Sequence, residues 1–391
     1  MKSKLFLLSL VALALAFTAC NKNQDEPQQS ETNATISVAV KSADLRAYED
    51  GAGDADMKVQ KLAVMVYQGG AQVAFKEVTD GSLEVKDIET TAGAKTLVVV
   101  ANYANQNLKG LSFDKVKALT HTLSADDQDP NKGTFMLTAE PVSVNLQKGN
   151  NYYGYADGDG NRLSIDKPIE LQHIHAGMAL TNLTVKFAES YKNLYSVKFD
   201  EGQLIALIAK SQSNVFGESL VNDDANYFYG AKLFGKTDGK YTPAEANYKE
   251  MAALKMALTE TGAQTGKGFY VLENNDAKHP TILCLKGELT QAGGDALTDE
   301  QAAQAVEAGW IVSTTDHSTY YPVLVNWEKD GYTFEGTTDK NGIVRNNKYE
   351  ISLTITGPGT NSPEDPTAEK ANLDVKCKVL SWVIVKQNVV W

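Results

Sequence analysis

Short runs in which apolar and polar residues alternate recur along most of this chain. A period of two is typical of strands that bury one face. The runs are bounded by Gly, Asn, Asp or Pro, so they predict an all-β protein of antiparallel β-sandwiches rather than alternating strands and helices. They cover residues 35–40, 59–67, 72–78, 96–102, 134–137, 142–146, 180–187, 204–209, 269–272, 281–285, 323–327, 349–356 and 373–391.

Helix signals are few. Residues 242–245 form a capping box with proline at the first helical position, followed by helically spaced apolar residues through Leu258. Residues 298–301 open a second helix that Gly309 closes. A third, weaker signal covers residues 113–119. No repeat of 20–50 residues occurs, so the chain is not a solenoid.

The first segment of the chain predicts export. Residues 1–4 are basic, and the apolar run of residues 5–17 is shorter than the roughly 20 residues that span a bilayer as a helix. Residues 1–19 therefore predict a signal peptide. Small residues precede Cys20, as in a bacterial lipobox, so Cys20 is expected to be acylated, although Phe17 replaces the usual Leu. A plain signal peptide with an incidental cysteine is the alternative.

The next segment predicts a tether and a first strand. Residues 21–33 contain no large apolar side chain, so they are expected to form a flexible tether. Ile36, Val38 and Val40 alternate with small or polar residues, which predicts a half-buried strand. Arg46, one of only three arginines in the chain, follows in a polar loop.

Composition narrows the classes of function. The length of 391 residues allows two or three domains, and 42% hydrophobic residues suffice for real cores. A net charge of −12 argues against nucleic acid as a partner. Cys284 and Cys377 lie in apolar strand-like runs, so they are expected to be buried and free. A disulfide between them in an oxidising compartment is the alternative.

Two motifs imitate metal sites. His173 and His175 are two residues apart on a predicted strand and would share a face, where a third ligand could complete a metal site. Ordinary strand positions are favoured. Residues 157–161 imitate the start of a calcium loop, but Arg162 and Pro168 stand where the motif requires Gly and Glu. A polar turn is the prediction, and no metal or cofactor is expected.

No catalytic site emerges. Asp126, Asp127 and Asp129 crowd one loop and are expected to be solvated. The chain has no strand–turn–helix serine motif and no phosphate-binding glycine loop. Carboxylates are numerous and lie mostly in loops, so no pair can be singled out as acid and base. The prediction is that the protein is not an enzyme.

Several segments form a characteristic series when they are taken in their order along the chain. They are Cys20 with its lipobox, residues 36–40, Arg46, residues 95–102, 169–171 and 346–359, and a terminal strand with Trp382. In this order they resemble type V pilins (fimbrillins) of the Bacteroidales, closer to the minor-fimbrium (Mfa-type) stalk subunit than to the major one. The resemblance covers nearly the whole chain. One departure is that His173 and His175 stand where an arginine is expected.

The resemblance implies two transthyretin-like β-sandwich domains, at residues 47–190 and 191–391, after a lipidated tether and removable strand at residues 20–46. It implies export as an outer-membrane lipoprotein precursor. An Arg-specific protease would then cut between Arg46 and Ala47. The alternative is that Arg46 is only a solvated loop residue.

Removal of residues 1–46 would take one strand out of a sandwich. It would expose unpaired backbone groups and the apolar floor beneath the first strand, a template for another strand. The tail, from about residue 375 to 391, could fill that groove in a neighbouring subunit by donor-strand exchange. The alternative is that the tail is the last core strand of the second domain. The predicted donor residues are Val383, Ile384, Val385, Val389, Val390 and Trp391.

The expected function is a structural subunit of a cell-surface fimbrium that mediates adhesion and biofilm formation. Expected partners are copies of itself, accessory tip and anchor subunits, the protease and an unidentified host or bacterial surface ligand. A tip or anchor subunit is one alternative, and a glycan-binding surface lipoprotein is another. The aromatic residues that could stack on sugars in the second case are Tyr152, Tyr153, Tyr155, Trp310, Tyr320, Tyr321 and Trp327.

Overall fold

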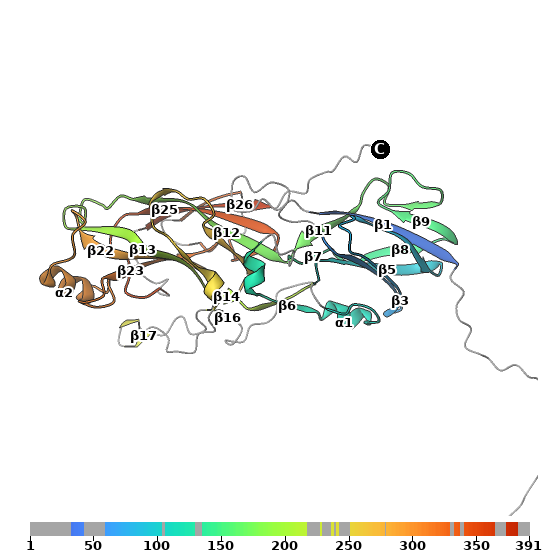
Figure 1. Cartoon of the computed structure of the whole chain (residues 1–391), viewed down its shortest axis with the longest axis horizontal. Helices are drawn as coiled ribbons and strands as arrows, with labels where there is room; N and C mark the ends of the chain where they lie inside the picture. Colours follow the sequence, from blue (N-terminus) through green and yellow to red (C-terminus); the bar gives the residue numbers. More distant parts are fainter. Residues whose placement is uncertain are drawn as a thin grey trace, which may run out of the picture.

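Strands form where β-branched and aromatic residues gather, and turns of glycine, asparagine or aspartate separate many of them. The computed structural model describes residues 33–42, 59–103, 106–129, 135–216, 227–228, 236–237, 240–241, 251–277, 279–328, 332–336, 340–363 and 373–381. The described strands form an elongated body, with β1 (Ala34–Ser42) toward one end and α2 (Asp299–Glu307) at the other (Figure 1). The predicted all-β fold with few helices is confirmed.

The N-terminal unit contains a ten-stranded sheet in the order β10-β9-β1-β11-β7-β5-β2-β3, with β4 paired to β1 and β8 paired to β5. Apart from β1, its strands are β2 (Leu62–Gln68), β3 (Ala71–Val78), β4 (Glu84–Thr90), β5 (Gly93–Ala101), β7 (Leu137–Thr138), β8 (Val142–Leu146), β9 (Gly149–Tyr153), β10 (Asn161–Leu163) and β11 (Ile169–His173).

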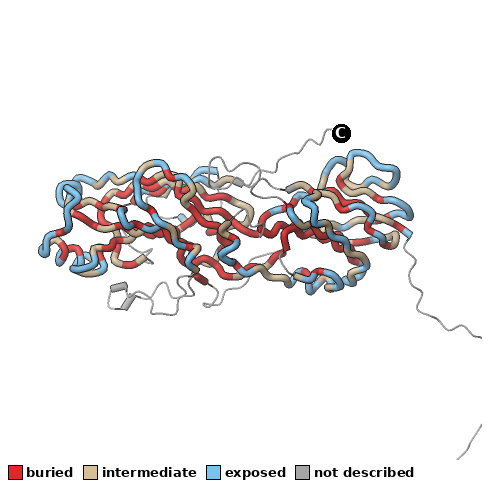
Figure 2. Tube along the Cα trace, in the orientation of Figure 1, coloured by how far each residue is buried: buried red, intermediate tan, exposed pale blue. Residues whose placement is uncertain are grey.

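Strand β2 shows why the sequence of some strands in this sheet is a continuous run of apolar residues rather than an alternating one. Leu62, Val64 and Val66 lie in a core inside the N-terminal unit. Met65 and Tyr67, on the opposite face of β2, belong to a second core that extends through the C-terminal unit. A strand buried on both faces cannot show the period of two. Buried residues accordingly follow one another along the middle of the body (Figure 2).

Short helical elements flank the N-terminal sheet. The helix α1 (Phe113–Lys117) begins at Ser112, whose side chain accepts a hydrogen bond from the backbone of Lys115. Its Phe113 ring packs on Tyr67, with 5.3 Å between ring centroids, so α1 covers the outer face of β2. Strand β6 (Thr120–Thr122) and the 3-10 helix η1 (Ala125–Gln128) follow.

The C-terminal unit is a sandwich of two sheets. One has six strands, in the order β20-β12-β25-β26-β24 with β21 paired to β12, and the other has four, in the order β19-β13-β22-β23. Their inner faces share one hydrophobic core. The strands are β12 (His175–Val185), β13 (Tyr195–Leu207), β19 (Lys255–Ala257), β20 (Gly262–Ala263), β21 (Gly268–Leu272), β22 (Ile282–Gln291), β23 (Ser318–Leu324), β24 (Tyr332–Glu335), β25 (Asn347–Ile355) and β26 (Leu373–Ser381).

Small pairs of strands complete the described residues. Strand β15 (Gln212–Asn214) pairs with β6, so it joins the two units. The remaining pairs are β14 (Ala209–Lys210) with β16 (Tyr227–Phe228), and β17 (Lys236–Thr237) with β18 (Lys240–Tyr241). No described helix is long and apolar enough to cross a membrane.

Most described strand pairs are antiparallel, as predicted, but five are parallel. Strand β1 runs parallel to β9 and β11, β9 runs parallel to β10, β12 runs parallel to β25, and β24 runs parallel to β26. Apart from β9 and β10, which only residues 154–160 separate, the parallel partners are distant in the sequence, because parallel strands need a crossover connection. Local alternation of side chains carries no signal for such pairs.

The chain passes from the first unit to the second much earlier than predicted. Strand β11 ends at His173 in the N-terminal sheet, and β12 begins at His175 in the C-terminal one. The predicted boundary at residue 190 therefore lies beyond the end of β12. Its apolar run resembled a last strand of the first domain, whereas its parallel partner β25 comes from the far end of the chain.

The three predicted helices differ in outcome. Thr298 and Gln301 form the expected capping box at the start of α2, and α1 occupies part of its predicted range. The helix predicted from the capping box at residues 242–245 through Leu258 is wrong over its described part, because residues 255–257 form β19 after a single 3-10 turn, η4 (Ala252–Leu254). Residues 242–250 lie outside the described residues. Cys284 and Cys377 are buried and free, as predicted.

Candidate polymerisation groove

Strand β1 lies inside the N-terminal sheet with neighbours on both edges (Figure 1). One edge pairs with β4 in antiparallel register from Ala34 to Ala39. The other edge pairs in parallel, first with β9 from Ala34 to Val38 and then with β11 from Val40 to Ser42. A strand in this position completes the sheet, and its removal would leave a groove edged by β4, β9 and β11.

The side chains predicted to anchor this strand are buried. Ile36 and Val38 are 0% exposed and Val40 is 4% exposed. All three belong to the core of the N-terminal unit, together with Val64 and Ile88 among others. Each such side chain contributes roughly 1.5–3 kcal/mol when it is fully buried. The floor of the groove is therefore apolar.

Backbone hydrogen bonds fix the register of β1 near both ends. The Asn33 N–H donates to the Thr90 carbonyl at 3.1 Å, and the Val40 N–H donates to the Leu83 carbonyl at 2.9 Å. Between them β4 carries a bulge at Asp87, whose φ of 51° places it in the left-handed region. The Asp87 N–H donates to the Ser37 hydroxyl at 3.0 Å, so the backbone N–H of the bulged residue has a hydrogen-bond partner.

The side chain of Asn151 adds a polar contact to the other edge. Its amide nitrogen donates to the carbonyls of Thr35 and Gln147, both at 2.9 Å. Its amide oxygen accepts from the Gln147 N–H at 2.9 Å. Asn151 is 1% exposed, so removal of β1 would leave part of a buried amide without its partner.

Shortening Ile36 should destabilise the uncleaved protein. We expect Ile36→Ala to lower its free energy of unfolding by about 2–5 kcal/mol, because the change leaves a cavity in a closed core. Urea unfolding of the full chain measures the difference. The control Thr35→Val sits one residue away on a half-buried position and removes one exposed hydrogen bond, so it should cost less than about 1 kcal/mol. Equal effects of the two variants would contradict the burial of Ile36.

The other residues of the predicted processing pathway are not placed. Cys20, Arg46 and Ala47 lie outside the described residues. Strand β1 ends at Ser42, so Arg46 follows it by four positions in the sequence.

The predicted donor tail is only partly placed. Residues 375–381 belong to β26, which pairs with β25 at nine positions and with β24 at four. Val375 and Cys377 of β26 are buried in the core. The tail therefore begins later than residue 375. The donor candidates Val383, Ile384, Val385, Val389, Val390 and Trp391 all lie outside the described residues.

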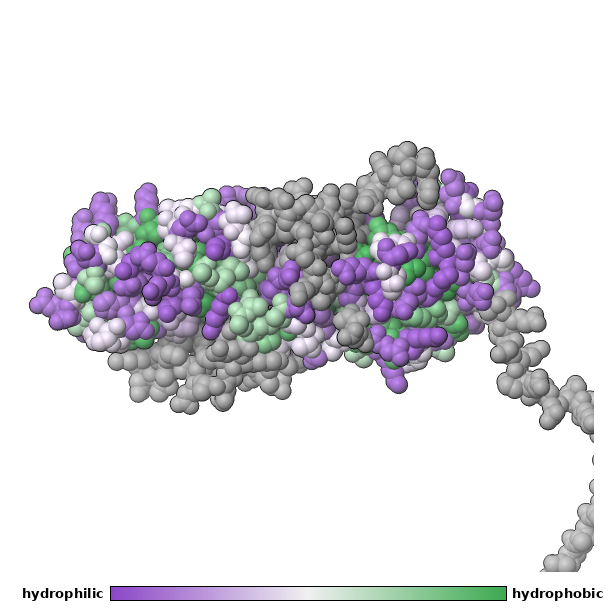
Figure 3. Space-filling view, in the orientation of Figure 1, coloured by the Kyte–Doolittle hydropathy of each residue, from purple (hydrophilic) through white to green (hydrophobic). Residues whose placement is uncertain are grey.

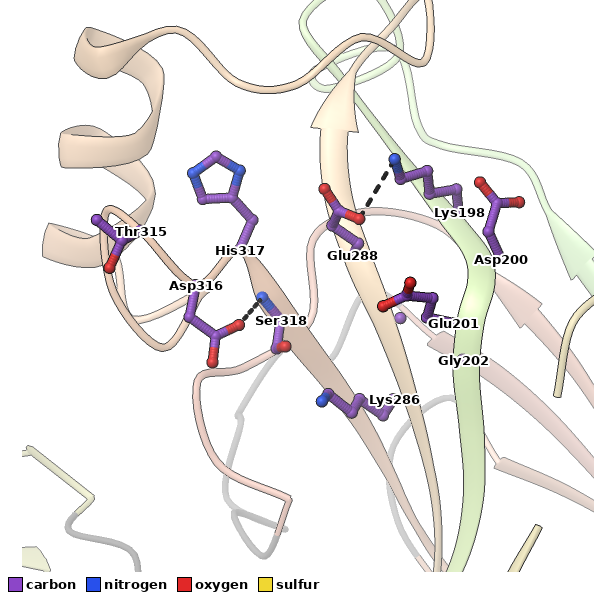
Figure 4. Close-up of a pocket in the computed structure, with 11 residues that line it drawn as sticks. Lys198, Asp200, Glu201, Gly202, Lys286, Glu288, Thr315, Asp316, His317 and Ser318 are labelled. Atoms are coloured by element: carbon purple, nitrogen blue, oxygen red, sulfur yellow. Dashed lines mark hydrogen bonds and ion pairs between the residues drawn. The ribbon is translucent and has the colours of Figure 1, made fainter. Parts of the chain in front are cut away.

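A polar depression lies at the opposite end of the molecule, with a volume of about 310 Å³ (Figure 4). Lys198 on β13 and Glu288 on β22 form an ion pair at 3.3 Å across its wall. The Ser318 N–H donates to Asp316 at 3.0 Å, and hydrogen bonding from Ser318 lowers the pKa of that carboxyl. His317 is the one aromatic ring on its wall, so it offers little surface for stacking on a sugar.

The aromatic residues considered for a glycan platform are dispersed. Tyr152 and Tyr155 pack against each other in the N-terminal unit. Trp310 packs on Tyr195 beside α2, and Tyr321 is fully buried in the C-terminal core. The described surface in Figure 3 is mainly hydrophilic, with small separate apolar areas. The structure does not bring these aromatic residues into one binding surface.

Two predictions about polar residues are wrong. Asp127 is not solvated but 0% exposed, and it lies between His121 and His175. His173 and His175 do not share a strand face, because they belong to different sheets on either side of Ile174. No sequence signal links the three residues of this cluster, because β6, η1 and β12 come together only in the folded chain.

Electrostatics of this cluster follow from its burial. Burial alone raises the pKa of the Asp127 carboxyl, but the hydrogen bond with His121 and the imidazole of His175, whose Nε2 lies 3.6 Å from Oδ1, outweigh burial and hold that pKa well below its usual range. Burial lowers the pKa of the His175 imidazole, and the Asp127 carboxylate opposes that shift.

Comparisons with known proteins cover both units. Residues 34–173 match the family model of the major fimbrial subunit protein (FimA), and residues 175–382 match that of the FimA4 pilin C-terminal domain. The two matches meet at Ile174, where the chain passes between its two main sheets.

Curated relatives align over the full length of the chain. The major fimbrium subunit FimA type-3 of Porphyromonas gingivalis is 46% identical over 400 residues, which cover 100% of both chains. FimA type-4 of the same species is 42% identical over 401 residues, again with 100% of both chains covered. The crystal structure of a fimbrilin (FimA) from P. gingivalis W83 matches with a TM-score of 0.78 at 40% identity, covering 91% of this chain and 99% of that one.

Proposed function

This chain belongs to the FimA family of major fimbrial subunit proteins, and from that premise we propose that it is a structural subunit of a fimbrium on the bacterial cell surface. The predicted Bacteroidales fimbrillin family is confirmed. The relatives described above are FimA proteins, and none of them supports the closer placement with the minor-fimbrium stalk type.

The observation that carries the proposed mechanism is the position of β1. Strand β1 pairs with neighbouring strands along both edges and is buried on its apolar face, yet the sequence places an arginine four residues after its end. We propose that residues 1–19 are a signal peptide and that Cys20 is acylated in an outer-membrane precursor. An Arg-specific protease then cuts between Arg46 and Ala47, and β1 leaves with the tether.

The vacated groove then binds the tail of a second copy. Val383, Ile384, Val385, Val389, Val390 and Trp391 are apolar and strand-forming, and in this proposal they replace Ile36, Val38 and Val40. Burial of four to six such side chains gives on the order of 10 kcal/mol gross. Ladder hydrogen bonds add roughly 0.5–1.5 kcal/mol each, and association and strand ordering oppose part of the sum.

The geometry of this contact makes a filament. A tail in one copy and a groove in the next form a head-to-tail interface that does not close on itself. Before cleavage, β1 occupies the same groove in the same molecule and blocks premature assembly. Residues 1–46 carry five basic and four acidic groups, so cleavage changes the net charge only from −12 to −13. Copies of like charge do not attract one another through gross charge, which favours strand insertion as the source of affinity.

Within the fimbrium we propose three kinds of partner. They are copies of this chain, accessory tip and anchor subunits at the fibre ends, and a surface ligand on host or bacterial cells. Adhesion and biofilm formation follow from the fibre as a whole.

The mass of the protein extracted from fimbriated cells tests this proposal. A chain that begins at Ala47 is the expected result, because processing must precede assembly. A lipidated chain that begins at Cys20 would overturn it and would instead indicate an anchor subunit or an anchored binding protein. The same extraction from cells that do not make this protein gives the background for the measurement.

A further inference from the structure

A buried cluster of three metal-ligand side chains lies where the two units meet. His121 is on β6 and Asp127 is on η1, both in the N-terminal half of the chain, whereas His175 opens β12 of the C-terminal unit. One donor atom from each residue lies within 4.8 Å of the other two. The fimbrial function proposed above does not use these side chains.

The distances suit a divalent transition metal. The Nε2 atoms of His121 and His175 lie 3.1 Å and 3.6 Å from the two carboxylate oxygens of Asp127. Bonds of about 2.0–2.2 Å to histidine nitrogen and carboxylate oxygen, in a tetrahedron, place such donors roughly 3.4 Å apart. The two imidazoles face different oxygens of the one carboxylate, and one donor atom of each residue lies within 4.8 Å of the other two, so an approach of both imidazoles toward a common ion would complete a three-ligand set.

Two of the donors lack ordinary partners. Neither ring nitrogen of His175 makes a hydrogen bond among the described residues, and the same is true of Oδ1 of Asp127. Both side chains are 0% exposed. Buried polar atoms are normally hydrogen-bonded, so each such exception calls for an explanation, and an ion between these atoms supplies one.

The surroundings hold the donors in place. Oδ2 of Asp127 accepts from the backbone N–H of Ser124 at 2.7 Å and from its hydroxyl at 3.0 Å. The ring of Phe135 packs edge-on against His175, with 5.1 Å between centroids. Gln128, next to Asp127, exchanges two hydrogen bonds with the backbone of Tyr270, at 2.7 and 2.9 Å. Such supporting contacts orient the ligands of a metal site.

Charge does not oppose a cation here. Asp127 is negative, and the nearby guanidinium of Arg345 is paired with Glu273 at 3.0 Å. Arg345 also donates to the carbonyls of Asn214 and Val215, both at 3.1 Å, so its donors point at those acceptors. The side chain of His121 is 11% exposed, which gives an ion a point of entry.

We propose that His121, Asp127 and His175 bind a zinc ion, with water in the fourth position. Two imidazoles and one carboxylate form a nitrogen–oxygen set that zinc accepts readily. The ion would tie β6 and η1 to β12 and so stiffen the junction between the two units. This inference is independent of cleavage and polymerisation.

Metal titration of the tag-free full chain, after chelator treatment, tests the site. We expect one Zn²⁺ per chain and a rise in the thermal midpoint of a few degrees at saturating zinc, because only the folded state presents the three ligands together. Co²⁺ used alone as a probe should give the intense visible bands of tetrahedral coordination. Asp127→Asn and His121→Gln should each weaken zinc binding at least 10-fold.

The chain offers a matched control in a second histidine–aspartate pair. His279 Nδ1 lies 2.9 Å from Asp276, and no third ligand among the described residues completes a cluster there. His279→Gln should therefore leave zinc binding unchanged. Circular dichroism at low temperature confirms that each variant is folded. Less than about 0.1 Zn²⁺ per wild-type chain, or equal affinity in wild type and Asp127→Asn, would overturn the proposal and identify the cluster as a hydrogen-bonded junction only.

Discussion

Subunits that carry Arg46→Ala are expected to accumulate as folded precursors and to form no fibres. Without the arginine the protease has no site after β1, so the strand stays in its own sheet. There it has the advantage of being tethered, because a segment of the same chain competes at a far higher effective concentration than the tail of another molecule. Electron microscopy of the cell surface and the mass of the extracted chain measure the two parts of this outcome.

Two control variants separate cleavage from folding. Arg162 is an exposed arginine of the N-terminal unit, and it donates to the Ala156 carbonyl at 2.9 Å. Arg162→Ala should leave both processing and fibres intact. Arg46→Lys keeps the positive charge and should behave like Arg46→Ala if the protease is specific for arginine. Normal fibres built from Arg46→Ala subunits would contradict the cleavage step.

Local patterns predicted most of the individual elements. Alternating residues marked β1 with Ile36, Val38 and Val40 on its buried face, and the structure places all three in the core. The capping box at Thr298 marked the start of α2 correctly. These signals depend on neighbours a few residues apart, which is the range over which side chains in one element share a face or a cap.

Long-range pairing could not be read in the same way. The apolar run at β12 has the composition of a buried strand, but nothing in it indicates that β25 is its partner. The predicted boundary between the two domains therefore came too late in the sequence. The same limit hid the cluster at Asp127. That residue lies in a polar sequence, yet the fold buries it between two histidines, one of them 48 positions away in the sequence. Proximity of this kind arises only when sheets assemble.

Deletion of residues 383–391 is expected to abolish assembly while leaving the fold intact. Strand β26 ends at Ser381, so the deletion spares its pairing with β25 and β24. The loss removes the apolar side chains that fill the groove of the next copy, which gives essentially complete loss of polymer. Gln387→Ala, in the polar link between the two apolar groups, should assemble normally. Unfolding in urea should give the same midpoint for the deleted and full-length chains.

Mixing the two defective subunits gives the sharpest test of strand exchange. The Arg46→Ala subunit has a tail to donate but a closed groove, whereas the cleaved deletion subunit has an open groove and no tail. A head-to-tail contact requires one of each, so the mixture should form discrete 1:1 dimers, while either subunit alone stays monomeric. Added to wild-type subunits, the cleaved deletion subunit should end growing fibres and shorten them in proportion to its share. Long polymers of the deletion subunit alone, or no dimer in the mixture, would show that residues 383–391 do not fill the groove of β1.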